Sequence, residues 1–333
     1  MSEPGELGQR SAPDPKAPHL CLWNTEGYYA LNAEAAPRYQ RVDHHDSQER
    51  LVGSWVGALV DDTYTLGFAA PFGGPDFVRE YDSADNVAAL VRAGLEHAAA
   101  RGAHRLEVRL KPPHYGEIEA HLLFVLLTIG CRVAEANVNY FIDLDRLGGA
   151  QGWSKGLRKQ ARRAIERGTE AGVTTDIAAD DDEMTWAEAY RVLEANRTQK
   201  GRPMRLPLDY VRSIRDAFPS LVRLVVAHAN GSMCAAALLY RVLPGRDVVQ
   251  YWGDAFHELP VSPMGALIDR VVTHVDDTGG RSMDIGISTD HGWPNLGLMQ
   301  FKRTFGATAE NRLELVGDID ELRGSSAWEQ VGG

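Results

Sequence analysis

The sequence of 333 residues contains 35 Lys and Arg against 46 Asp and Glu, which gives a formal net charge of −11. Apolar residues make up 44% of the chain and charged residues 24%, proportions typical of a soluble globular protein. The acidic balance argues against a protein that coats nucleic acid, because such proteins are usually basic. The longest apolar run, 122–129, is too short to cross a bilayer, so no stable membrane association is expected.

The N-terminal segment 1–18 is polar and rich in Pro and Gly, without the apolar core that a signal peptide needs. We expect a disordered lead-in there. The 3 cysteines lie far apart among apolar neighbours, at Cys21, Cys131 and Cys234. They are typical of reduced thiols, so a cytoplasmic location is expected. His44 and His45 are adjacent and not at a chelating spacing, so no metal site and no bound cofactor are predicted.

The first half of the chain alternates strand and helix signals. Apolar side chains recur at helical spacing over 83–101, and the pattern stops at Gly102, a residue that commonly ends helices. A second helix is predicted to stop before Gly130. In chain order the predicted elements are strands 51–59 and 64–70, helix 83–101, strand 105–109, helix 118–129 and strand 131–144.

The second half repeats this order. The predicted elements are strands 222–228, 233–242 and 247–253, helix 263–277, strand 282–285, helix 296–304 and strand 307–316. The offset between matching positions is nearly constant, 177 residues for Gly102 with Gly279 and for Glu107 with Asp284, and 176 for Gly130 with Gly306. A constant offset indicates an internal duplication, although alternation of strands and helices is by itself common to any α/β chain.

Strands followed by helix, strand, helix and strand are the order of a GNAT unit. The sequence therefore predicts an α/β (α+β) fold of two tandem GNAT-like domains, each a mixed, mostly antiparallel sheet flanked by helices. Small residues over 148–152 are typical of a linker. The predicted domains are 19–148 and 153–325, with the active site in the second.

Four segments of the second half carry a family resemblance. They are 251–254 (Tyr-Trp-Gly-Asp), 262–263 (Ser-Pro), 283–286 (Met-Asp-Ile-Gly) and 301–307 (Phe-Lys-Arg-Thr-Phe-Gly-Ala). With them, most of 150–318 resembles the Fem-type transferases, tandem-GNAT proteins that include aminoacyl-tRNA-dependent peptide ligases. The resemblance extends more faintly over 50–145. It implies that an amine attacks an activated acyl carbonyl to form an amide.

The resemblance also implies roles for single residues. Lys302 matches a lysine that stabilises the oxyanion, which is reasonable because a fixed cation lowers the barrier to attack on an ester. Asp284, at the end of a buried strand, is predicted to orient the attacking amine or to pair with Lys302; a purely structural role stays open, since Glu107 occupies the matching place in the first half. The predicted substrate-binding residues are Tyr251, Trp252, Ser262, Phe301, Lys200 and Arg202.

Two acyl donors remain open, acyl-CoA and aminoacyl-tRNA. A CoA-binding loop presents glycines and backbone N–H groups to the pyrophosphate, whereas 259–266 contains two prolines and one usable glycine. A helix over 155–167 carries cations at a spacing of four residues, in a chain that is otherwise acidic. The predicted RNA-binding residues are Lys155, Arg158, Lys159, Arg162, Arg163 and Arg167.

These observations predict an acyltransferase that moves an aminoacyl group from aminoacyl-tRNA to a small-molecule or peptide amine. A CoA-dependent N-acyltransferase that uses the same cleft is the alternative. The third hypothesis is a non-catalytic GNAT-like binding protein.

Overall fold

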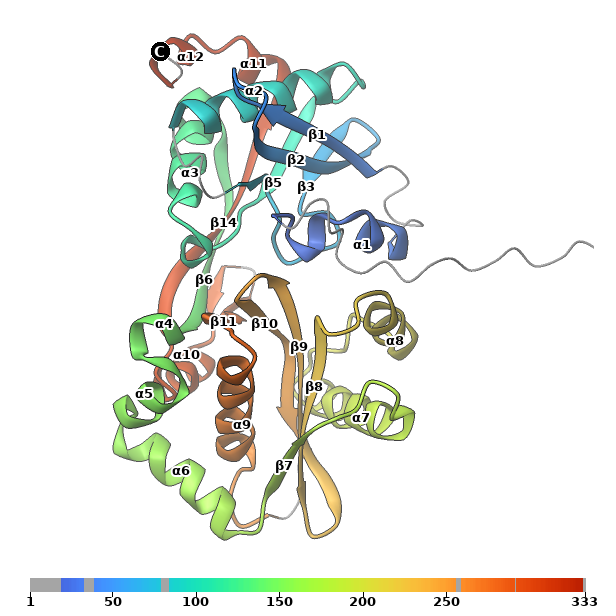
Figure 1. Ribbon diagram of the computed structural model, residues 1–333, viewed down its shortest axis with the longest axis vertical. Coiled ribbons are helices and arrows are strands. Elements are labelled where there is room, and N and C mark those ends of the chain that lie inside the picture. Colours follow the sequence, from blue (N-terminus) through green and yellow to red (C-terminus); the bar gives the residue numbers. More distant parts are fainter. Residues whose placement is uncertain (1–18, 33–38, 79–83, 256–258, 291, 332–333) are drawn as a thin grey trace, which may run out of the picture.

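The computed structural model describes residues 19–32, 39–78, 84–255, 259–290 and 292–331. The predicted lead-in 1–18 lies outside the described residues. Figure 1 shows two lobes stacked along the long axis, with two long strands running from one lobe into the other. These strands are β6 (Arg132–Asp143) and β14 (Thr308–Asp318). They are therefore the elements that join the lobes.

The upper lobe of Figure 1 is built mainly from the first half of the chain. Its elements before β6 are η1 (Leu22–Asn24), α1 (Glu26–Leu31), β1 (Tyr39–His45), β2 (Leu51–Val60), β3 (Thr63–Leu66), β4 (Asp76–Phe77), α2 (Ala84–Ala99), β5 (Arg105–Arg109), η3 (Pro113–Tyr115) and α3 (Ile118–Ile129). The C-terminal helices α11 (Ile319–Arg323) and α12 (Trp328–Val331) return to this lobe and pack against α2.

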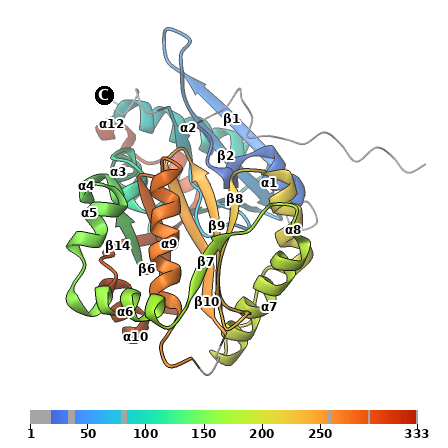
Figure 2. The ribbon, with the colours of Figure 1, turned by 60° about the horizontal axis from the view of Figure 1, so that its bottom comes forward.

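The lower lobe contains most of the second half. Its elements are α4 (Leu144–Leu147), α5 (Gly149–Gly156), α6 (Lys159–Glu170), β7 (Thr174–Ile177), α7 (Glu183–Gln199), α8 (Leu208–Ala217), β8 (Val222–Ala229), β9 (Ser232–Leu243), β10 (Arg246–Asp254), α9 (Met264–Asp277), β11 (Ser282–Ile287), β12 (Thr289–Asp290), β13 (Trp293–Pro294) and α10 (Leu296–Thr304). Figure 2 shows α6 and α9 on one face of the lower sheet and α7 and α8 on the other.

The predicted duplication is confirmed by the strand pairing. In the described residues two strand pairs are parallel, β3 with β5 and β10 with β11, and each pair is connected through a helix, α2 or α9. Parallel neighbours require such a crossover, whereas antiparallel strands can be joined by a turn. The same strand–helix–strand unit therefore occurs once in each half, and the predicted fold class is confirmed.

The two units have exchanged their last strands. β6, which ends the first unit, pairs with β11 of the second, and β14, which ends the second, pairs with β5 of the first. β6 and β14 also pair with each other, so that 12 strands form one sheet in the order β1-β2-β3-β5-β14-β6-β11-β10-β9-β8-β7, with β4 beside β2. The repeat in the sequence does not predict this exchange. The domain boundaries at 148 and 153 stay a prediction.

The predicted basic helix over 155–167 is wrong in one respect, because the structure divides it into α5 and α6. Leu157 and Arg158 between them have extended backbones, and the Leu157 side chain is buried. The predicted linker over 148–152 is also largely helical, since α5 begins at Gly149. Close packing places α6 on α9: a side chain at Gly265 would lie 2.7 Å from the backbone of Ala164.

Strand exchange predicts that the halves cannot fold apart. A fragment of residues 1–148 lacks β14, which leaves β5 without an antiparallel neighbour and removes Leu315, Ile319 and Leu322 from the core under α2 and α3. We expect this fragment to lack a cooperative thermal transition by circular dichroism, whereas the full chain unfolds with its lobes coupled. Addition of a peptide that spans 306–331 should restore the transition. A fragment that folds alone would contradict the prediction.

Candidate active site

The lower sheet opens at the carboxyl ends of its two parallel strands. The pairing of β10 with β11 covers only 246–248 and 282–284, although β10 continues to Asp254 and β11 to Ile287. Gly286 has a φ of 76°, a left-handed conformation that favours glycine, and it turns the chain away from the ladder. Helix α10 follows this turn and packs at the opening. Carboxyl ends of parallel strands are where α/β folds commonly place ligands.

Lys302 on α10 is buried at this opening, with 2% of its surface exposed. Its ammonium group donates to the carbonyl oxygens of Gly286 and Ile287, at 2.7 Å and 2.9 Å, and lies 5.6 Å from the centre of the Tyr140 ring. The two carbonyls and the ring together offer the cation a partly negative environment. The predicted residue is therefore held inside the protein, at the end of β11.

Burial lowers the pKa of the Lys302 ammonium from 10.5 to about 7. The Asp284 carboxylate opposes this change and the Arg312 guanidinium adds to it. Desolvation disfavours the charged form of an amine, and the two carbonyl contacts replace only part of the lost hydration. Lysines with such pKa values are uncommon in purely structural positions and frequent in active sites.

Asp284 does not form an ion pair with Lys302 within the described residues. Its carboxylate accepts hydrogen bonds from the Gly286 backbone N–H at 2.6 Å and from the Asn139 side-chain amide at 3.0 Å. The same Asn139 nitrogen donates to Glu310 at 3.2 Å, and Glu310 accepts from His114. Asn139, Asp284 and Glu310 lie on β6, β11 and β14, the three adjacent strands at the exchange. We call these three residues, together with His114, the polar cluster.

Two adjoining cavities lie on the other side of α10. The first, of about 660 Å³, is bounded by the end of α7, the end of β10 and the start of α10; among its lining residues are Lys200, Arg202, Trp252, Asp254, Ser262 and Phe301. The second, of about 500 Å³, lies between α6, the first turn of α9 and α10; among its lining residues are Gln160, Arg167, Ser262, Gly265, Phe301 and Phe305. Ser262 and Phe301 line both cavities.

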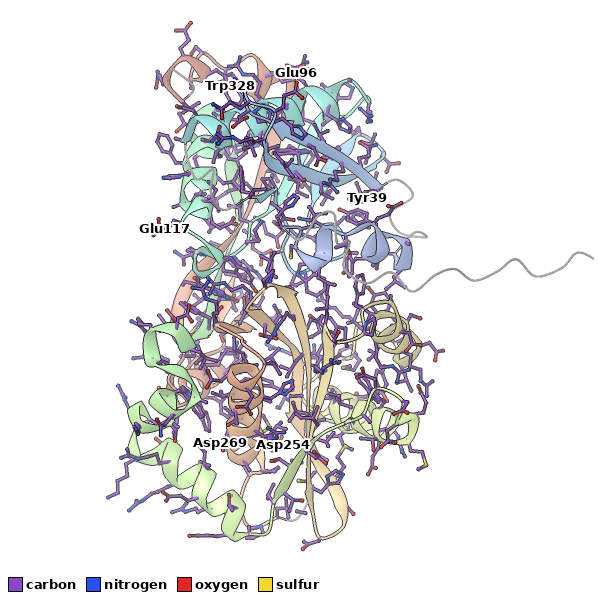
Figure 3. All side chains as sticks on the ribbon, viewed as in Figure 1. Tyr39, Glu96, Glu117, Asp254, Asp269 and Trp328 are labelled. Carbon is purple, nitrogen blue, oxygen red and sulfur yellow. The ribbon has the colours of Figure 1, made fainter. Side chains whose placement is uncertain are left out.

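The predicted substrate-binding residues do not all line the cavities. Trp252 lines the first cavity and its ring meets that of Phe301 edge-on at 6.1 Å, whereas Tyr251 is buried on the opposite face of β10, under the Arg197 guanidinium. Successive residues of a strand face opposite sides, which explains the difference. Figure 3 shows Asp254, which also lines the first cavity, within the lower lobe.

Polar side chains along the first cavity are held by hydrogen bonds. Lys200 donates to the Asn196 side chain at 3.0 Å, and Asn196 donates to the Asp254 carboxylate at 3.0 Å. Arg202 pairs with Asp290 at 3.0 Å. Three cations line the cavity, Arg197, Lys200 and Arg202, against the carboxylate of Asp254. The wall therefore favours a ligand that carries an anionic group.

The six predicted RNA-binding residues are all exposed. We call them the basic surface: Lys155 at the end of α5, Arg158 before α6, and Lys159, Arg162, Arg163 and Arg167 on α6. No carboxylate of the described residues lies within ion-pair distance of any of them. Arg167 reaches the second cavity, so the basic surface and that cavity are continuous.

Asn139, Glu310 and His114 were not singled out from the sequence. Each sits in a segment whose polar residues are ordinary for a half-exposed strand or loop, and no local motif marks them. They meet only because β6 and β14 pair, with Asn139 directly opposite Glu310. These residues can be predicted to meet only if the pairing of β6 with β14 is known.

No helix among the described residues is long and apolar enough to cross a membrane. Comparison with known proteins gives a family match in the second half: residues 155–303 match the model of the acetyltransferase (GNAT) domain. No curated protein matches the chain in sequence.

Solved structures resemble the chain along most of its length. FemX has a TM-score of 0.69 at 12% identity, with 89% of this chain and 91% of that chain covered. L-PGS from Bacillus licheniformis has 0.54 at 13%, covering 99% and 100%. The C-terminal domain (DUF2156) of a putative lysylphosphatidylglycerol synthetase from Agrobacterium fabrum has 0.53 at 14%, covering 90% and 94%.

At such identities these likenesses concern the fold. The expected resemblance to Fem-type proteins is confirmed at that level, since FemX shares the arrangement over nine-tenths of both chains. The second half therefore contains a GNAT-type acetyltransferase domain, which supports an acyltransferase, and the fold of the whole chain is similar to that of FemX.

Proposed function

We propose that this acyltransferase moves an aminoacyl group from aminoacyl-tRNA to the amine of a small molecule or peptide. The observation that carries the proposal is the basic surface, whose cations outnumber the two carboxylates of α6, Glu166 and Glu170, and which reaches the second cavity through Arg167. The six cations of the basic surface are more than the binding of one pyrophosphate requires. The basic surface is suited to a polyanion that passes over α6 and inserts its end beside α9.

The spacing of the cations supports this orientation. Lys159, Arg163 and Arg167 follow one another every four residues on α6, which places them about 6 Å apart along the helix. Each phosphate that they neutralise releases condensed counterions, so binding should depend strongly on salt. The remainder of the chain is acidic, which would keep RNA away from other faces.

The first turn of α9 is poorly equipped for the pyrophosphate of CoA. The segment before it contains Pro260 and Pro263, which have no N–H, and the Met264 N–H is directed to the Ser262 hydroxyl at 3.3 Å. CoA remains the second candidate donor, since the second cavity lies at this turn and the matching family model is that of an acetyltransferase domain.

The proposed chemistry uses Lys302 at the end of β11. Attack of an amine on the ester carbonyl creates an oxyanion, and a cation already held by the protein stabilises that charge without reorganisation. The Gly286 and Ile287 carbonyls keep the ammonium at the strand opening, and Asp284 favours its charged form. The attacking amine would approach from the side of the polar cluster, with Asp284 as a partner for its N–H.

The donor is tested by turnover with each candidate. Purified protein is incubated with a labelled aminoacyl-tRNA pool and a mixture of small amines, with and without RNase, and in parallel with acetyl-CoA. We expect labelled amide that disappears after RNase treatment, together with no thermal stabilisation by CoA. Amide formation that survives RNase, with stabilisation by CoA, would replace the tRNA donor by CoA.

Lys302→Met should lose activity while the protein stays folded. We expect turnover to fall by about a hundredfold or more, as when an oxyanion-stabilising donor is removed. The exposed neighbour Arg303→Met provides the matched control and should remain active. Near-normal turnover by Lys302→Met would reject the assignment.

The same variant tests the low pKa of Lys302. The unfolded chain keeps this proton up to about pH 10.5 and the folded chain only up to about pH 7, so the free energy of unfolding should rise with pH between these values. Wild type should therefore gain several kcal/mol relative to Lys302→Met from pH 7 to 10, since one pKa unit corresponds to about 1.4 kcal/mol. Urea unfolding at several pH values measures the difference, and parallel curves would contradict it.

The basic surface is tested by the salt dependence of tRNA binding. Lys159→Gln together with Arg163→Gln should reduce the slope of log Kd against log salt by about 1 to 2, since each phosphate contact contributes about 0.7 to 0.9. Arg101→Gln together with Arg191→Gln, on exposed positions of other elements, is the control and should leave the slope unchanged. An equal effect of both pairs would show that binding is not localised on α6.

A further inference from the structure

His114 and Glu310 form a buried pair where the lobes meet. His114 belongs to η3 of the first half and Glu310 to β14, and the His114 side chain is 3% exposed. The Glu310 carboxylate accepts the His114 backbone N–H at 3.0 Å through one oxygen and contacts Nδ1 of the ring at 2.5 Å through the other. The backbone bond fixes the carboxylate, so its second oxygen is directed at Nδ1.

This geometry determines the tautomer of the imidazole. A carboxylate oxygen accepts hydrogen bonds, so Nδ1 carries the proton and Nε2 keeps its lone pair in the neutral ring. The Phe141 ring stacks on the imidazole, with centroids 4.2 Å apart and an interplanar angle of 6°. The ring is therefore fixed in plane and in tautomer, with Nε2 as a potential proton acceptor.

Nε2 of His114 is buried and has no hydrogen-bond partner among the described residues. The Tyr115 hydroxyl, the Asn139 carbonyl oxygen and Nε of Arg312 share this property, and all belong to residues in or next to the polar cluster. Burial of a polar atom without a hydrogen-bond partner is energetically unfavourable. Unpartnered buried polar atoms are uncommon in native proteins, and those on residues of the polar cluster are candidates for contacts with a polar ligand.

The pair is connected to Lys302 through two side chains. The Asn139 amide donates to both Glu310 and Asp284, and Asp284 acts on the charge of Lys302. On the other side Tyr115, whose ring is 4.3 Å from that of His114, lines a cavity of about 420 Å³ between the lobes. In Figure 3, Glu117, which also lines this cavity, lies at the level where the lobes meet.

We infer that His114, positioned by Glu310, accepts the proton of the attacking amine in amide formation. The inference rests on the proposed function. The amine nitrogen forms a bond to the acyl carbon and its proton moves to Nε2; the ester C–O bond then breaks, and the leaving hydroxyl oxygen receives the proton from the imidazolium. Glu310 stabilises the imidazolium between these steps. Lys302 stabilises the oxyanion on the same carbon.

Charged groups from several elements act on this proton transfer. They are Glu310 and Arg312 on β14, Asp284 on β11 and Lys302 on α10. Of these groups Glu310 contacts the imidazole directly, whereas Lys302 and Arg312 both interact electrostatically with Asp284. The net field near the ring therefore depends first on Glu310, its direct partner.

Substitution of His114 tests the role in catalysis. With the donor that wild type uses, His114→Gln should lose turnover by about 10²–10⁴, the usual contribution of a general base. His104→Gln, an exposed histidine of the same lobe placed 3.9 Å from Asp320, is the matched control. Once bonded to the acyl carbon, the nitrogen of hydroxylamine is much more acidic than that of an alkylamine and can lose its proton to water, so the loss with this acceptor should be much smaller. Equal loss with both acceptors would indicate a structural role and overturn the inference.

Glu310→Gln gives an independent readout. The variant should lower kcat with little change in KM, because the carboxylate stabilises the imidazolium that forms during the reaction and does not hold the bound substrate. Two-bond ¹⁵N–¹H NMR on His-labelled wild type and on His114→Gln assigns the ring and should show the Nδ1–H tautomer. An Nε2–H tautomer would overturn the inference even if transfer from tRNA is found.

The two proposals fail differently. Turnover with acetyl-CoA that is insensitive to RNase would reject the tRNA donor. The His114→Gln and wild-type proteins would then be compared with acetyl-CoA as the donor, and that comparison would still test the role of His114. If turnover is RNase-sensitive and His114→Gln stays within threefold of wild type, His114 is rejected as the proton acceptor and aminoacyl-tRNA is retained as the donor. A wild-type protein inactive with either donor and every amine would overturn both.

Discussion

The exchange of last strands is the constraint on which the rest of this structure depends. β6 and β14 pair with each other and each with the parallel strand of the opposite unit, so the two sheets become one. The three central strands β14, β6 and β11 thereby acquire positions that neither unit has alone. Because a register shift by one residue would turn every side chain to the other face, this pairing also fixes which polar groups meet. Glu310, Asn139 and Asp284 come together through it.

Bringing these polar groups together in the protein interior is energetically unfavourable. Lys302 is buried beside two carbonyls with its pKa lowered to about 7, and several neighbouring polar atoms lack partners. Apolar layers on both lobes offset this: Trp55, Leu90 and Leu126 are fully buried in the upper core, and Leu267 and Val271 in the lower. A site with poorly hydrated polar groups is stable only when the surrounding apolar cores are well packed. The same packing fixes the charged groups in position, so that they can stabilise a transition state without rearrangement.

Local elements were predictable from the sequence and long-range pairing was not. Helices 118–129 and 296–304 and strand 105–109 have the bounds that periodicity and terminal glycines predict. Those signals act within one turn or one strand. The break at Leu157, by contrast, follows from the burial of a single leucine, and the meeting of Asn139 with Glu310 follows from pairing across 171 residues. Lys302 was identifiable because its neighbours in sequence resemble a family motif, whereas His114 has no such neighbours.

Helix α10 connects the two sides of the proposed reaction. Adjacent helical residues point about 100° apart, so Phe301 lines both cavities while Lys302 turns to the end of β11. A donor carried along α6 and an acceptor admitted between the lobes would therefore reach the same short segment from opposite sides. Neither lobe alone offers both approaches: the basic surface belongs to the second unit and His114 to the first. In the proposed reaction, the duplicated fold thus matters because exchange of its last strands brings a base from one copy and a cation from the other to one carbonyl.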